Sequence, residues 1–271
     1  MTSTKAELFR SLHSTGDVLV LPNAWDVASA RIVEQAGAKA VATTSAGVAW
    51  SLGQPDGDRL DREQAMAAVA RIVAAVDVPV TADIETGFGA DAEGVAETVR
   101  QVIAAGAVGV NIEDSVGDGL RDVAEQAERY AAARAAADES GVPLFVNARI
   151  DTYLLSVGHS ETRLDETLAR AQAFVDAGAD GVFVPGALDD DTLAALVAGI
   201  PAPLNVLGWA GARSVATLRD LGVARVTVGA RIALAAYSLA ARAAAEMLTE
   251  GTYEATSATL VHDDLNTLLD N

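Results

Sequence analysis

Residues 105–114 read AGAVGVNIED, and this stretch combines the three features that decide the fold. Gly106 stands where a helix commonly ends in a left-handed residue, because glycine adopts that conformation without a steric penalty. A short β-branched run follows at 108–112 and ends in the polar residues Glu113 and Asp114. A helix end, a buried strand and a polar strand end, in this order, are typical of a βαβ unit.

The same unit recurs along the chain. Gly37, Gly178 and Gly222 also stand just before short apolar runs. Eight such runs are predicted to form strands, each followed by a segment that can form a helix. Eight repeats predict a closed (β/α)8 TIM barrel of the α/β class, with an N-terminal helix and a C-terminal helical extension. The predicted strands cover residues 18–21, 40–44, 78–84, 108–112, 144–149, 181–184, 203–207 and 225–229.

Helix starts and domain limits follow from the same pattern. An N-cap side chain accepts hydrogen bonds from the first free backbone amides of a helix, and the candidates are Asp61, Asp91, Ser160 and Asp189. Repetition of one unit without a Pro-, Ser- or Gly-rich linker predicts a single domain over residues 1–271. A doubly wound open sheet is the alternative, disfavoured because the first strand lacks a Gly-x-Gly-x-x-Gly turn.

The composition excludes several classes of function. The 271 residues include 38 acidic and 19 basic side chains, so the formal charge is −19 at pH 7, which repels nucleic acid and anionic membranes. There is no cysteine, which excludes disulfides, thiolate metal sites and a cysteine nucleophile. No run reaches the roughly 18 uninterrupted apolar residues of a membrane span, and residues 1–15 lack the apolar core of a signal peptide. We expect a cytoplasmic protein without nucleic-acid or membrane partners.

Polar residues gather where the predicted strands end, and in a barrel the carboxyl ends of the strands line the active site. Three acids stand at neighbouring strand ends, namely Asp83, Glu85 and Glu113. Negative charge gathered at one rim is costly unless a cation neutralises it. Oxygen-only ligands favour Mg²⁺ or Mn²⁺ over Zn²⁺. The alternative is that these acids are solvated charges that cap the following helices.

The basic residues narrow the chemistry further. Arg149 ends a neighbouring strand, where it can bind a substrate carboxylate through two parallel hydrogen bonds or pair with one of the acids. Lys5 and Lys39 are the only lysines, and neither lies at the expected catalytic rim. Schiff-base and pyridoxal phosphate chemistry are therefore excluded. Among the histidines, only His159 follows a strand end, and we expect it to be a loop residue.

Four motifs occur in a fixed order along the chain. They are Thr44-Ser45-Ala46-Gly47 continuing to Leu52-Gly53-Gln54-Pro55-Asp56, then Asp83-Ile84-Glu85-Thr86-Gly87-Phe88-Gly89, Gly109-Val110-Asn111-Ile112-Glu113-Asp114, and Asn147-Ala148-Arg149. Together they resemble the isocitrate lyase and phosphoenolpyruvate mutase superfamily, and the match extends from Leu21 to Ala230. The combination is far more specific than any one motif.

The resemblance implies a Mg²⁺-dependent enzyme that acts on a 2-oxo acid or 2-hydroxy diacid and breaks a carbon–carbon or carbon–phosphorus bond through an enolate. It implies that Asp83 binds Mg²⁺ directly, while Glu85 and Glu113 act mainly through bound waters. It also implies that Arg149 and Asn205 contact substrate carboxylate oxygens. Hydroxyl and backbone N–H donors to the substrate would come from the loop of Thr44, Ser45, Ala46 and Gly47.

Two further residues each have two interpretations. Asp56 aligns with the acid that approaches the substrate in the mutase branch, as nucleophile or orienting group. It also lies in Gln54-Pro55-Asp56-Gly57, which is a strong turn sequence without any catalytic role. Trp25, after the first strand, can cover the substrate as an apolar wall or fill the barrel mouth.

The sequence departs from the superfamily pattern at two places. The lyases carry a Lys-Lys/Arg-Cys-Gly-His loop after the fourth strand, but residues 115–122 of this chain contain neither Cys nor Lys. The same segment lacks the lysines and asparagine of the mutase gating loop. Gly186 stands where the lyases place a glutamate. Neither standard mechanism therefore transfers intact.

We expect a Mg²⁺-dependent lyase that cleaves or decarboxylates a small 2-oxo acid or hydroxy diacid, with oxaloacetate as one candidate. The alternatives are phosphonopyruvate hydrolase or phosphoenolpyruvate mutase chemistry and a non-catalytic 2-oxo acid binding protein. The expected partners are a small carboxylate substrate and further copies of the chain, as a dimer or tetramer. The superfamily commonly swaps its last barrel helix, and the apolar segment 232–248 is compatible with that or with an ordinary eighth helix.

Overall fold

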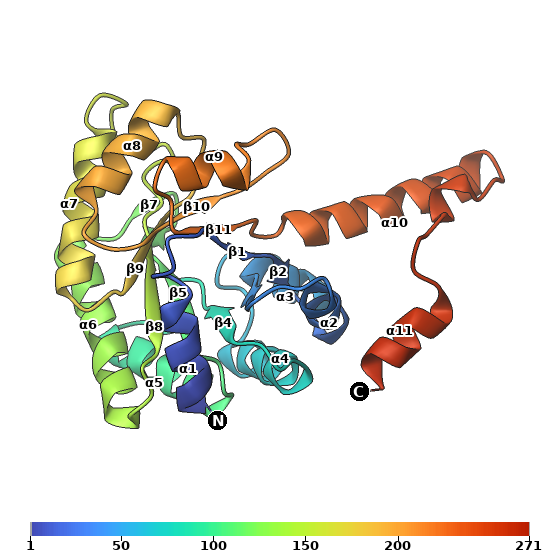
Figure 1. The fold of residues 1–271 in the computed structure, drawn as a ribbon, viewed down its shortest axis with the longest axis horizontal. Coiled ribbons are helices and arrows are strands. Elements are labelled where there is room, and N and C mark those ends of the chain that lie inside the picture. The colour runs from blue at the N-terminus through green and yellow to red at the C-terminus, as the bar shows by residue number, and fades with distance from the viewer. Residues whose placement is uncertain (1, 271) are drawn as a thin grey trace.

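The chain forms a barrel of parallel strands surrounded by helices (Figure 1). The computed structural model describes residues 2–270, and the strand order of its large sheet is β1-β11-β10-β9-β8-β5-β4-β3-β2. The expected TIM barrel is therefore confirmed. The strands are β1 (Leu19–Leu21), β2 (Asn23–Ala24), β3 (Val41–Thr43), β4 (Val80–Asp83), β5 (Gly109–Glu113), β8 (Phe145–Arg149), β9 (Gly181–Val184), β10 (Leu204–Leu207) and β11 (Arg225–Thr227), with a separate hairpin of β6 (Ser115–Val116) and β7 (Gly119–Leu120).

The first barrel strand is interrupted at Pro22, which separates β1 from β2 and has no N–H to donate. β1 pairs with β11, and β2 pairs with β3, so this strand joins the last repeat to the second. The side chain of Asn23 bonds on both sides of the interruption. Its Nδ2 donates to the carbonyl of Thr43 at 2.9 Å, and its Oδ1 accepts from the amide of Val228 at 2.9 Å.

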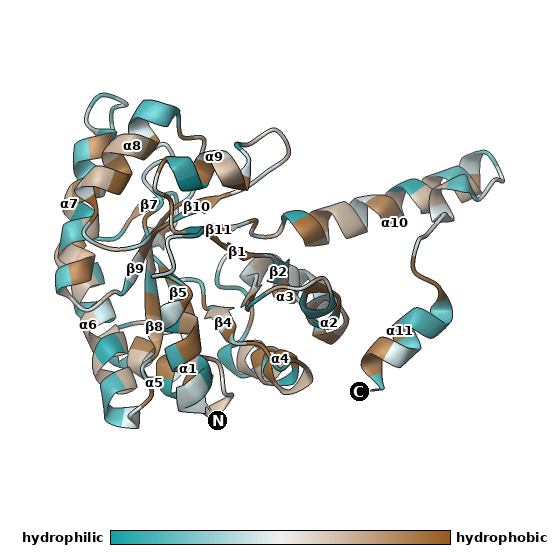
Figure 2. Ribbon diagram, in the orientation of Figure 1, coloured by the Kyte–Doolittle hydropathy of each residue, from teal (hydrophilic) through white to brown (hydrophobic). Residues whose placement is uncertain are grey.

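Helices cover the outside of the sheet and turn their apolar faces toward it. In α5, for example, Val95, Val99 and Val102 are fully buried at helical spacing. Figure 2 shows hydrophilic residues on the outer surfaces of the surrounding helices. The helices are α1 (Thr2–Ser11), α2 (Val27–Gln35), α3 (Ser45–Ser51), α4 (Arg62–Ala75), α5 (Ala92–Ala104), α6 (Val123–Ser140), α7 (Arg163–Asp176), α8 (Asp190–Gly199), α9 (Val215–Asp220), α10 (Arg231–Thr249) and α11 (His262–Leu269), with a 3-10 turn at Glu254–Thr256.

Three of the four expected N-caps are confirmed. Asp61, Asp91 and Asp189 each accept a hydrogen bond from a backbone amide in the first turn of α4, α5 and α8. The cap at Ser160 is wrong, because residues 159–162 form a turn and α7 begins only after Thr162. The glycines before the strands adopt the expected left-handed conformation, with φ of 94°, 89°, 105° and 87° at Gly37, Gly106, Gly178 and Gly222.

The amino end of the barrel is closed by α1. Phe9 is fully buried there, and its ring meets that of Phe145 edge-on at 5.7 Å between centroids. His13 stacks on Phe145 at 4.0 Å. The N-terminal helix expected from the sequence thus forms the floor of the barrel, and access to the interior is left to the carboxyl ends of the strands.

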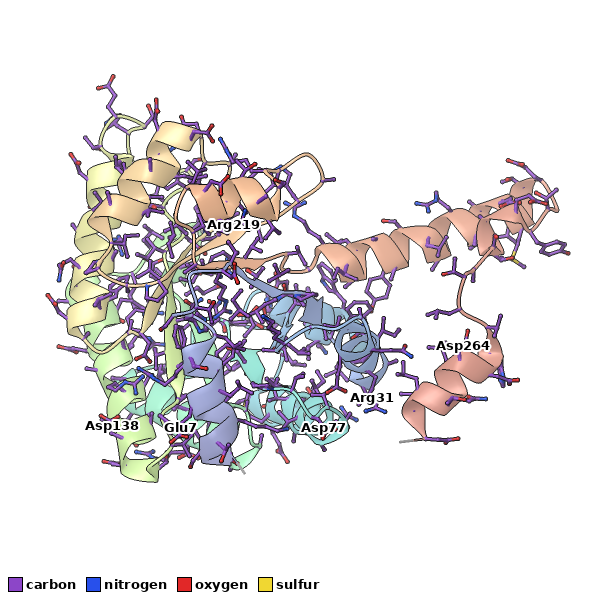
Figure 3. The ribbon with its side chains drawn as sticks, in the orientation of Figure 1. Glu7, Arg31, Asp77, Asp138, Arg219 and Asp264 are labelled. Atoms are coloured by element: carbon purple, nitrogen blue, oxygen red, sulfur yellow. The ribbon has the colours of Figure 1, made fainter. Side chains whose placement is uncertain are left out.

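The C-terminal extension leaves the barrel. α10 projects away from it, and α11 returns toward α2, where Arg31 Nε donates to the carbonyl of Leu268 at 2.9 Å (Figures 1 and 3). Ala233 is the one buried residue of α10. Among residues 2–270, no helix combines the length and the apolar character needed to cross a membrane.

The close packing of the barrel interior can be tested at Gly109, in β5. A Cβ added there would lie 2.8 Å from Thr81 Oγ1 and 2.9 Å from Phe9 Cε1. Gly109→Ala should therefore destabilise the protein by about 1–3 kcal/mol, as overpacking does, in a chemical denaturation experiment. Gly119→Ala is the control, because a Cβ at Gly119 meets nothing closer than 4.0 Å. Equal stability of the two variants would contradict the packing described.

Candidate active site

A cavity of about 260 Å³ opens at the carboxyl ends of the barrel strands. It is lined by the ends of β3, β4, β5, β8, β9, β10 and β11 and by the start of α3. Seven of the residues predicted from the sequence line this cavity. They are Thr44, Ser45, Ala46, Asp56, Asp83, Arg149 and Asn205.

Four other predicted residues lie outside the cavity lining. Trp25 packs against the main core, and a Cβ added at Gly47 would lie only 2.8 Å from Trp25 Cβ. The two residues thus pack against each other beneath α3, and of the two interpretations of Trp25 the structure places it in the packing of the barrel mouth. Glu85 and Glu113 also lie outside the lining, because each is engaged with a different partner.

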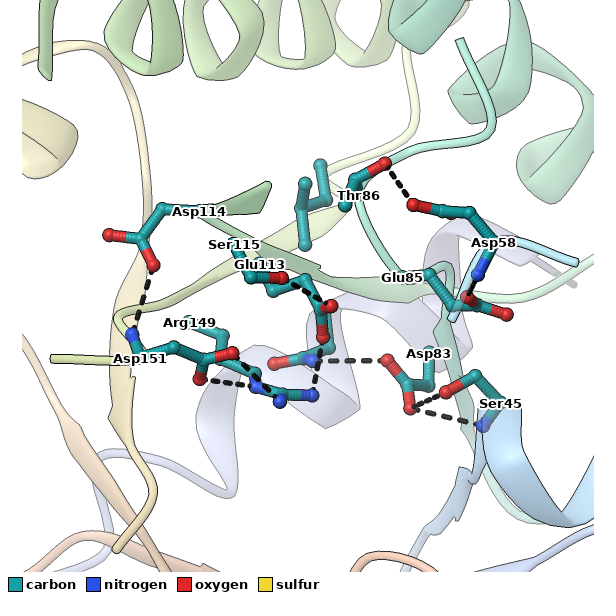
Figure 4. Close-up of polar contacts among 12 residues, drawn as sticks. Ser45, Asp58, Asp83, Glu85, Thr86, Glu113, Asp114, Ser115, Arg149 and Asp151 are labelled. Atoms are coloured by element: carbon teal, nitrogen blue, oxygen red, sulfur yellow. Dashed lines mark hydrogen bonds and ion pairs between the residues drawn. The ribbon is translucent and has the colours of Figure 1, made fainter. Parts of the chain in front are cut away.

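Asp83, at the end of β4, is the acid held at the centre of the cavity wall. Its Oδ2 accepts from the amide of Ser45 at 3.0 Å and from Ser45 Oγ at 2.8 Å (Figure 4). Its Oδ1 accepts from Asn111 Nδ2 at 3.1 Å, and its own amide donates to Thr43 Oγ1 at 2.8 Å. Donors from the end of β3 and from β5 therefore fix one orientation of this carboxylate.

Glu85 ties two loops together above β4. It has a positive φ of 51°, and its Oε2 accepts from the amide of Asp58. Asp58 in turn accepts from Thr86 Oγ1 at 2.7 Å. Burial raises the pKa of Glu85 to about 8, and the negative charges of Asp58, Asp83 and Asp56 add to the shift. Glu85 therefore holds the loop that contains Asp56 against the rim.

Arg149 is paired with two acids. Its Nη1 lies 2.5 Å from Glu113 Oε2, and its Nε and Nη2 donate to the two oxygens of Asp151 at 2.7 and 2.9 Å (Figure 4). Burial alone would lower the pKa of Arg149, but Glu113 and Asp151 outweigh burial and raise it. Of the two sequence interpretations of Arg149, the ion pair is the one found, although the side chain also lines the cavity.

Further polar and charged groups hold Glu113 and Asp151, the two acids that pair with Arg149, in place. Asp114 accepts from the amide of Asp151 at 2.9 Å and lies 3.2 Å from Arg170 Nη1. Ser115 Oγ donates to Glu113 at 2.7 Å. Burial raises the pKa of Glu113 to about 7, against the opposing charge of Arg149.

The three predicted metal ligands do not form one cluster. Within residues 2–270, no group of three His, Cys, Asp or Glu side chains lies close enough to hold a metal ion. Glu85 faces the amide of Asp58 and Glu113 faces Arg149. Direct binding of Mg²⁺ by Asp83, with Glu85 and Glu113 acting through waters at the same rim, stays a prediction.

The donor set still fits Mg²⁺. Asp83 presents a carboxylate to the cavity, and the described lining residues include neither His nor Cys. Mg²⁺ in proteins commonly binds one or two carboxylates and keeps several waters. Asp83 would hold the ion, and the buried acids Glu85 and Glu113, whose pKa values are raised by burial, would gain from a cation nearby.

No role was predicted for Asp151, Asn111 or Arg225, although all three belong to this region. Asp151 follows Arg149 by two residues, a spacing that allows both side chains to meet at a strand end. Asn111 stands two residues before Glu113 on the inward face of β5 and accepts from Asn147 at 3.0 Å. Arg225 could have been recognised as a charged residue at the start of a strand whose three residues are all buried.

The two sequence departures have structural counterparts. Residues 115–120 form the β6–β7 hairpin in place of the expected catalytic or gating loop. Gly186 has φ of 135°, and a Cβ there would lie 2.8 Å from Tyr153 Cβ. The backbone therefore requires glycine at Gly186, and the absence of the lyase glutamate is built into the local fold.

Comparison with known proteins agrees with this geometry. The family model described as phosphoenolpyruvate phosphomutase matches residues 9–248. The uncharacterized protein Rv1998c of Mycobacterium tuberculosis (strain ATCC 25618 / H37Rv) is 43% identical over 243 residues, which cover 90% of this chain and 89% of that protein. The 2-methylisocitrate lyase of Salmonella typhimurium (strain LT2) is 33% identical over 258 residues, covering 91% and 83%.

A solved structure of phosphonopyruvate hydrolase with oxalate and Mg²⁺ has the same fold. Its TM-score against this chain is 0.84 at 26% identity, with 97% of this chain and 94% of that chain covered. The relatives thus include lyases and carbon–phosphorus hydrolases that act on small acids, and one of them was crystallised with Mg²⁺.

The raised pKa of Glu85 predicts how stability depends on pH. Its pKa is about 8 in the folded chain and 4.5 in the unfolded chain, so the unfolded state loses its proton first and stability falls as the pH rises toward 8. His13, whose pKa burial lowers to about 3, acts in the opposite sense only below pH 6.5. Without divalent cations, the unfolding temperature should therefore fall between pH 6.5 and 8.

Glu85→Gln should flatten this slope in a thermal unfolding series with a chelator present. Glu161→Gln, at an exposed loop position, should keep the slope of the parent protein. An unchanged slope in Glu85→Gln would show that Glu85 is not buried in its protonated form.

Proposed function

Because this chain belongs to the phosphoenolpyruvate phosphomutase family, within the isocitrate lyase and phosphoenolpyruvate mutase superfamily, we propose that it is a Mg²⁺-dependent carbon–carbon lyase. Its substrate would be a small 2-oxo acid or hydroxy diacid that is cleaved or decarboxylated to an enolate. The observation that carries this proposal is the orientation of Asp83 at the cavity wall by Ser45 and Asn111. A bound Mg²⁺ would supply Lewis-acid stabilisation of negative charge on the substrate oxygens.

The chain's own groups would bind and orient the acid. Thr44, Ser45 and Ala46 line one wall. Both donors of Ser45 bond to Asp83, so the hydroxyl of Thr44 and the backbone amide of Ala46 would be the donors to a carboxylate. Arg149 adds positive charge opposite them, although Glu113 and Asp151 already engage its guanidinium. Arg149 would therefore contribute a positive potential and a fixed part of the cavity wall. It would not bind a substrate carboxylate through two parallel hydrogen bonds.

Asp56 is the proposed proton donor and acceptor. Asp56 and Asp83 are the carboxyl groups among the described residues that line the cavity, and Asp83 already accepts three hydrogen bonds. Burial raises the pKa of Asp56, which lets it hold a proton nearer neutral pH. With no cysteine in the chain, Asp56 would protonate the carbon of the enolate in place of a thiol.

The test is a thermal unfolding screen with Mg²⁺ alone and with Mg²⁺ plus oxalate, pyruvate, oxaloacetate, isocitrate or phosphonopyruvate, each oxo acid also being assayed for product. Mg²⁺-dependent stabilisation by oxalate and release of pyruvate or glyoxylate would support the lyase. Asp83→Asn should abolish the Mg²⁺-dependent increase in unfolding temperature. Asp118→Asn, at the exposed tip of the hairpin, should keep that increase. Retained binding in Asp83→Asn would refute the metal site.

The same screen separates the other activities. Turnover of phosphonopyruvate alone, lost in Asp56→Ala with Mg²⁺ binding intact, would favour carbon–phosphorus chemistry over the lyase. Stabilisation by oxalate without any product would favour a 2-oxo acid binding protein.

We also propose that the protein is a homo-oligomer whose α10 packs on a second copy. α10 carries apolar residues although it stands clear of the barrel (Figure 2). Tyr237 and Leu248 lie eleven residues apart on one face of this helix and are 42% and 87% exposed, and an apolar helix face of this kind commonly marks an interface.

Sedimentation velocity should therefore find a dimer or tetramer. Tyr237→Glu combined with Leu248→Glu should shift it toward the monomer, because charges would enter the buried centre of the interface. Arg242→Gln, at an exposed position of the same helix, should leave the assembly intact. A monomeric parent protein would contradict the proposal.

A further inference from the structure

Arg225 is a buried cation without a protein partner at the floor of the cavity. It begins β11, is 2% exposed and lines the cavity. Its Nε and Nη1 are buried without a hydrogen-bond partner, and within residues 2–270 its side chain forms no ion pair. Its guanidinium carbon lies 6.0 Å from the centre of the Phe9 ring, so α1 covers it from below.

The other arginines of the cavity differ from Arg225. Arg149 is neutralised by Glu113 and Asp151. Arg231 is exposed at the mouth, where it lies 5.9 Å from the ring of Trp209. Among the described residues, Arg225 is therefore the buried arginine of this cavity whose charge is not neutralised by an acid.

This arrangement is costly for the protein alone. Taking a charge out of water without a partner costs several kcal/mol. Burial lowers the pKa of Arg225 to about 9, with only the charge of Asp83 acting in the other direction. A cost of this kind is typical of a group that meets its partner when a ligand binds.

A second unpartnered group lies at the same level of the barrel. Thr81, on β4, is 1% exposed and lines the cavity, and its Oγ1 has no hydrogen-bond partner. Its hydroxyl and Phe9 flank the same point, since a Cβ on Gly109 would approach both within 3 Å. Two buried donor groups thus line the same cavity without a hydrogen-bond partner.

We propose that Arg225 and Thr81 form an anion subsite at the floor of the cavity, which takes the second carboxylate of a dianionic substrate. The inference rests on the proposed function, in which the first carboxylate meets the wall of Thr44, Ser45 and Ala46. A monocarboxylate would leave Arg225 unpaired, whereas a dicarboxylate neutralises it. The substrate class is therefore a 2-oxo or 2-hydroxy dicarboxylate rather than a monocarboxylate.

The test compares malate with lactate, two 2-hydroxy acids that differ by one carboxylate, by equilibrium binding in the presence of Mg²⁺. The parent protein should bind malate at least about tenfold more tightly, as expected for a buried charge pair. Arg225→Gln should remove this preference, because it should weaken the binding of malate and change the binding of lactate little. Arg225→Lys, which keeps the charge, should retain part of the preference.

Stability separates a ligand role from a structural one. Arg225→Gln should unfold at the parent temperature or above, because it removes an unpaired buried charge. Arg134→Gln is the comparison, since Arg134 pairs with Asp180 at 2.5 Å and its loss should destabilise the fold. If Arg225→Gln does not fold, Thr81→Val provides the same test and should also reduce the malate preference.

The outcomes are distinct. Binding of both acids with a malate preference that survives Arg225→Gln, or Thr81→Val in its place, would overturn the subsite and leave the proposed function standing. Absence of Mg²⁺-dependent binding of malate, lactate and oxalate to the parent protein would overturn both.

Discussion

The pairing of Arg149 with Glu113 and Asp151 is the interaction on which the site depends. Acids from neighbouring strands lie together at the carboxyl end of this barrel and repel one another. In a chain of net charge −19, few basic side chains are present to offset that repulsion. Arg149 lies opposite Glu113 in the β5–β8 register, so the ladder itself places the cation between the acids. Beyond Asp151, Asp114 accepts from the backbone amide of Asp151 and is itself paired with Arg170.

The strands and their order could be predicted from the sequence because they depend on local signals. Short apolar runs and the glycines before them mark each repeat, and residues 181–184 form a strand as expected. Ser160 was wrong as a cap because the loop before α7 extends further than its composition indicated. Most strand limits differ from the prediction by one or two residues, as at β4, which begins at Val80 and ends at Asp83.

The site could be predicted only in part. Spacing placed Asp83 and Arg149 at the rim, but the partners of Glu85 and Glu113 depend on loop conformation and on register between strands distant in sequence. The same reason explains Trp25 and Gly47, which resemble binding residues by motif yet pack against each other. Family membership fixes the scaffold, while the β6–β7 hairpin and Gly186 depart from the superfamily's sequence pattern.

The interrupted first strand bears on how the protein is made. Asn23 bonds to the amide of Val228, a partner 205 residues away along the chain. During synthesis the early repeats can pair with one another as they emerge, but their outer edge stays open until β11 has left the ribosome. Contacts of such long sequence separation slow folding and leave an unpaired edge exposed in the meantime. The nascent protein would therefore spend most of its synthesis as an open sheet, and closure of the ring would be among its last folding events.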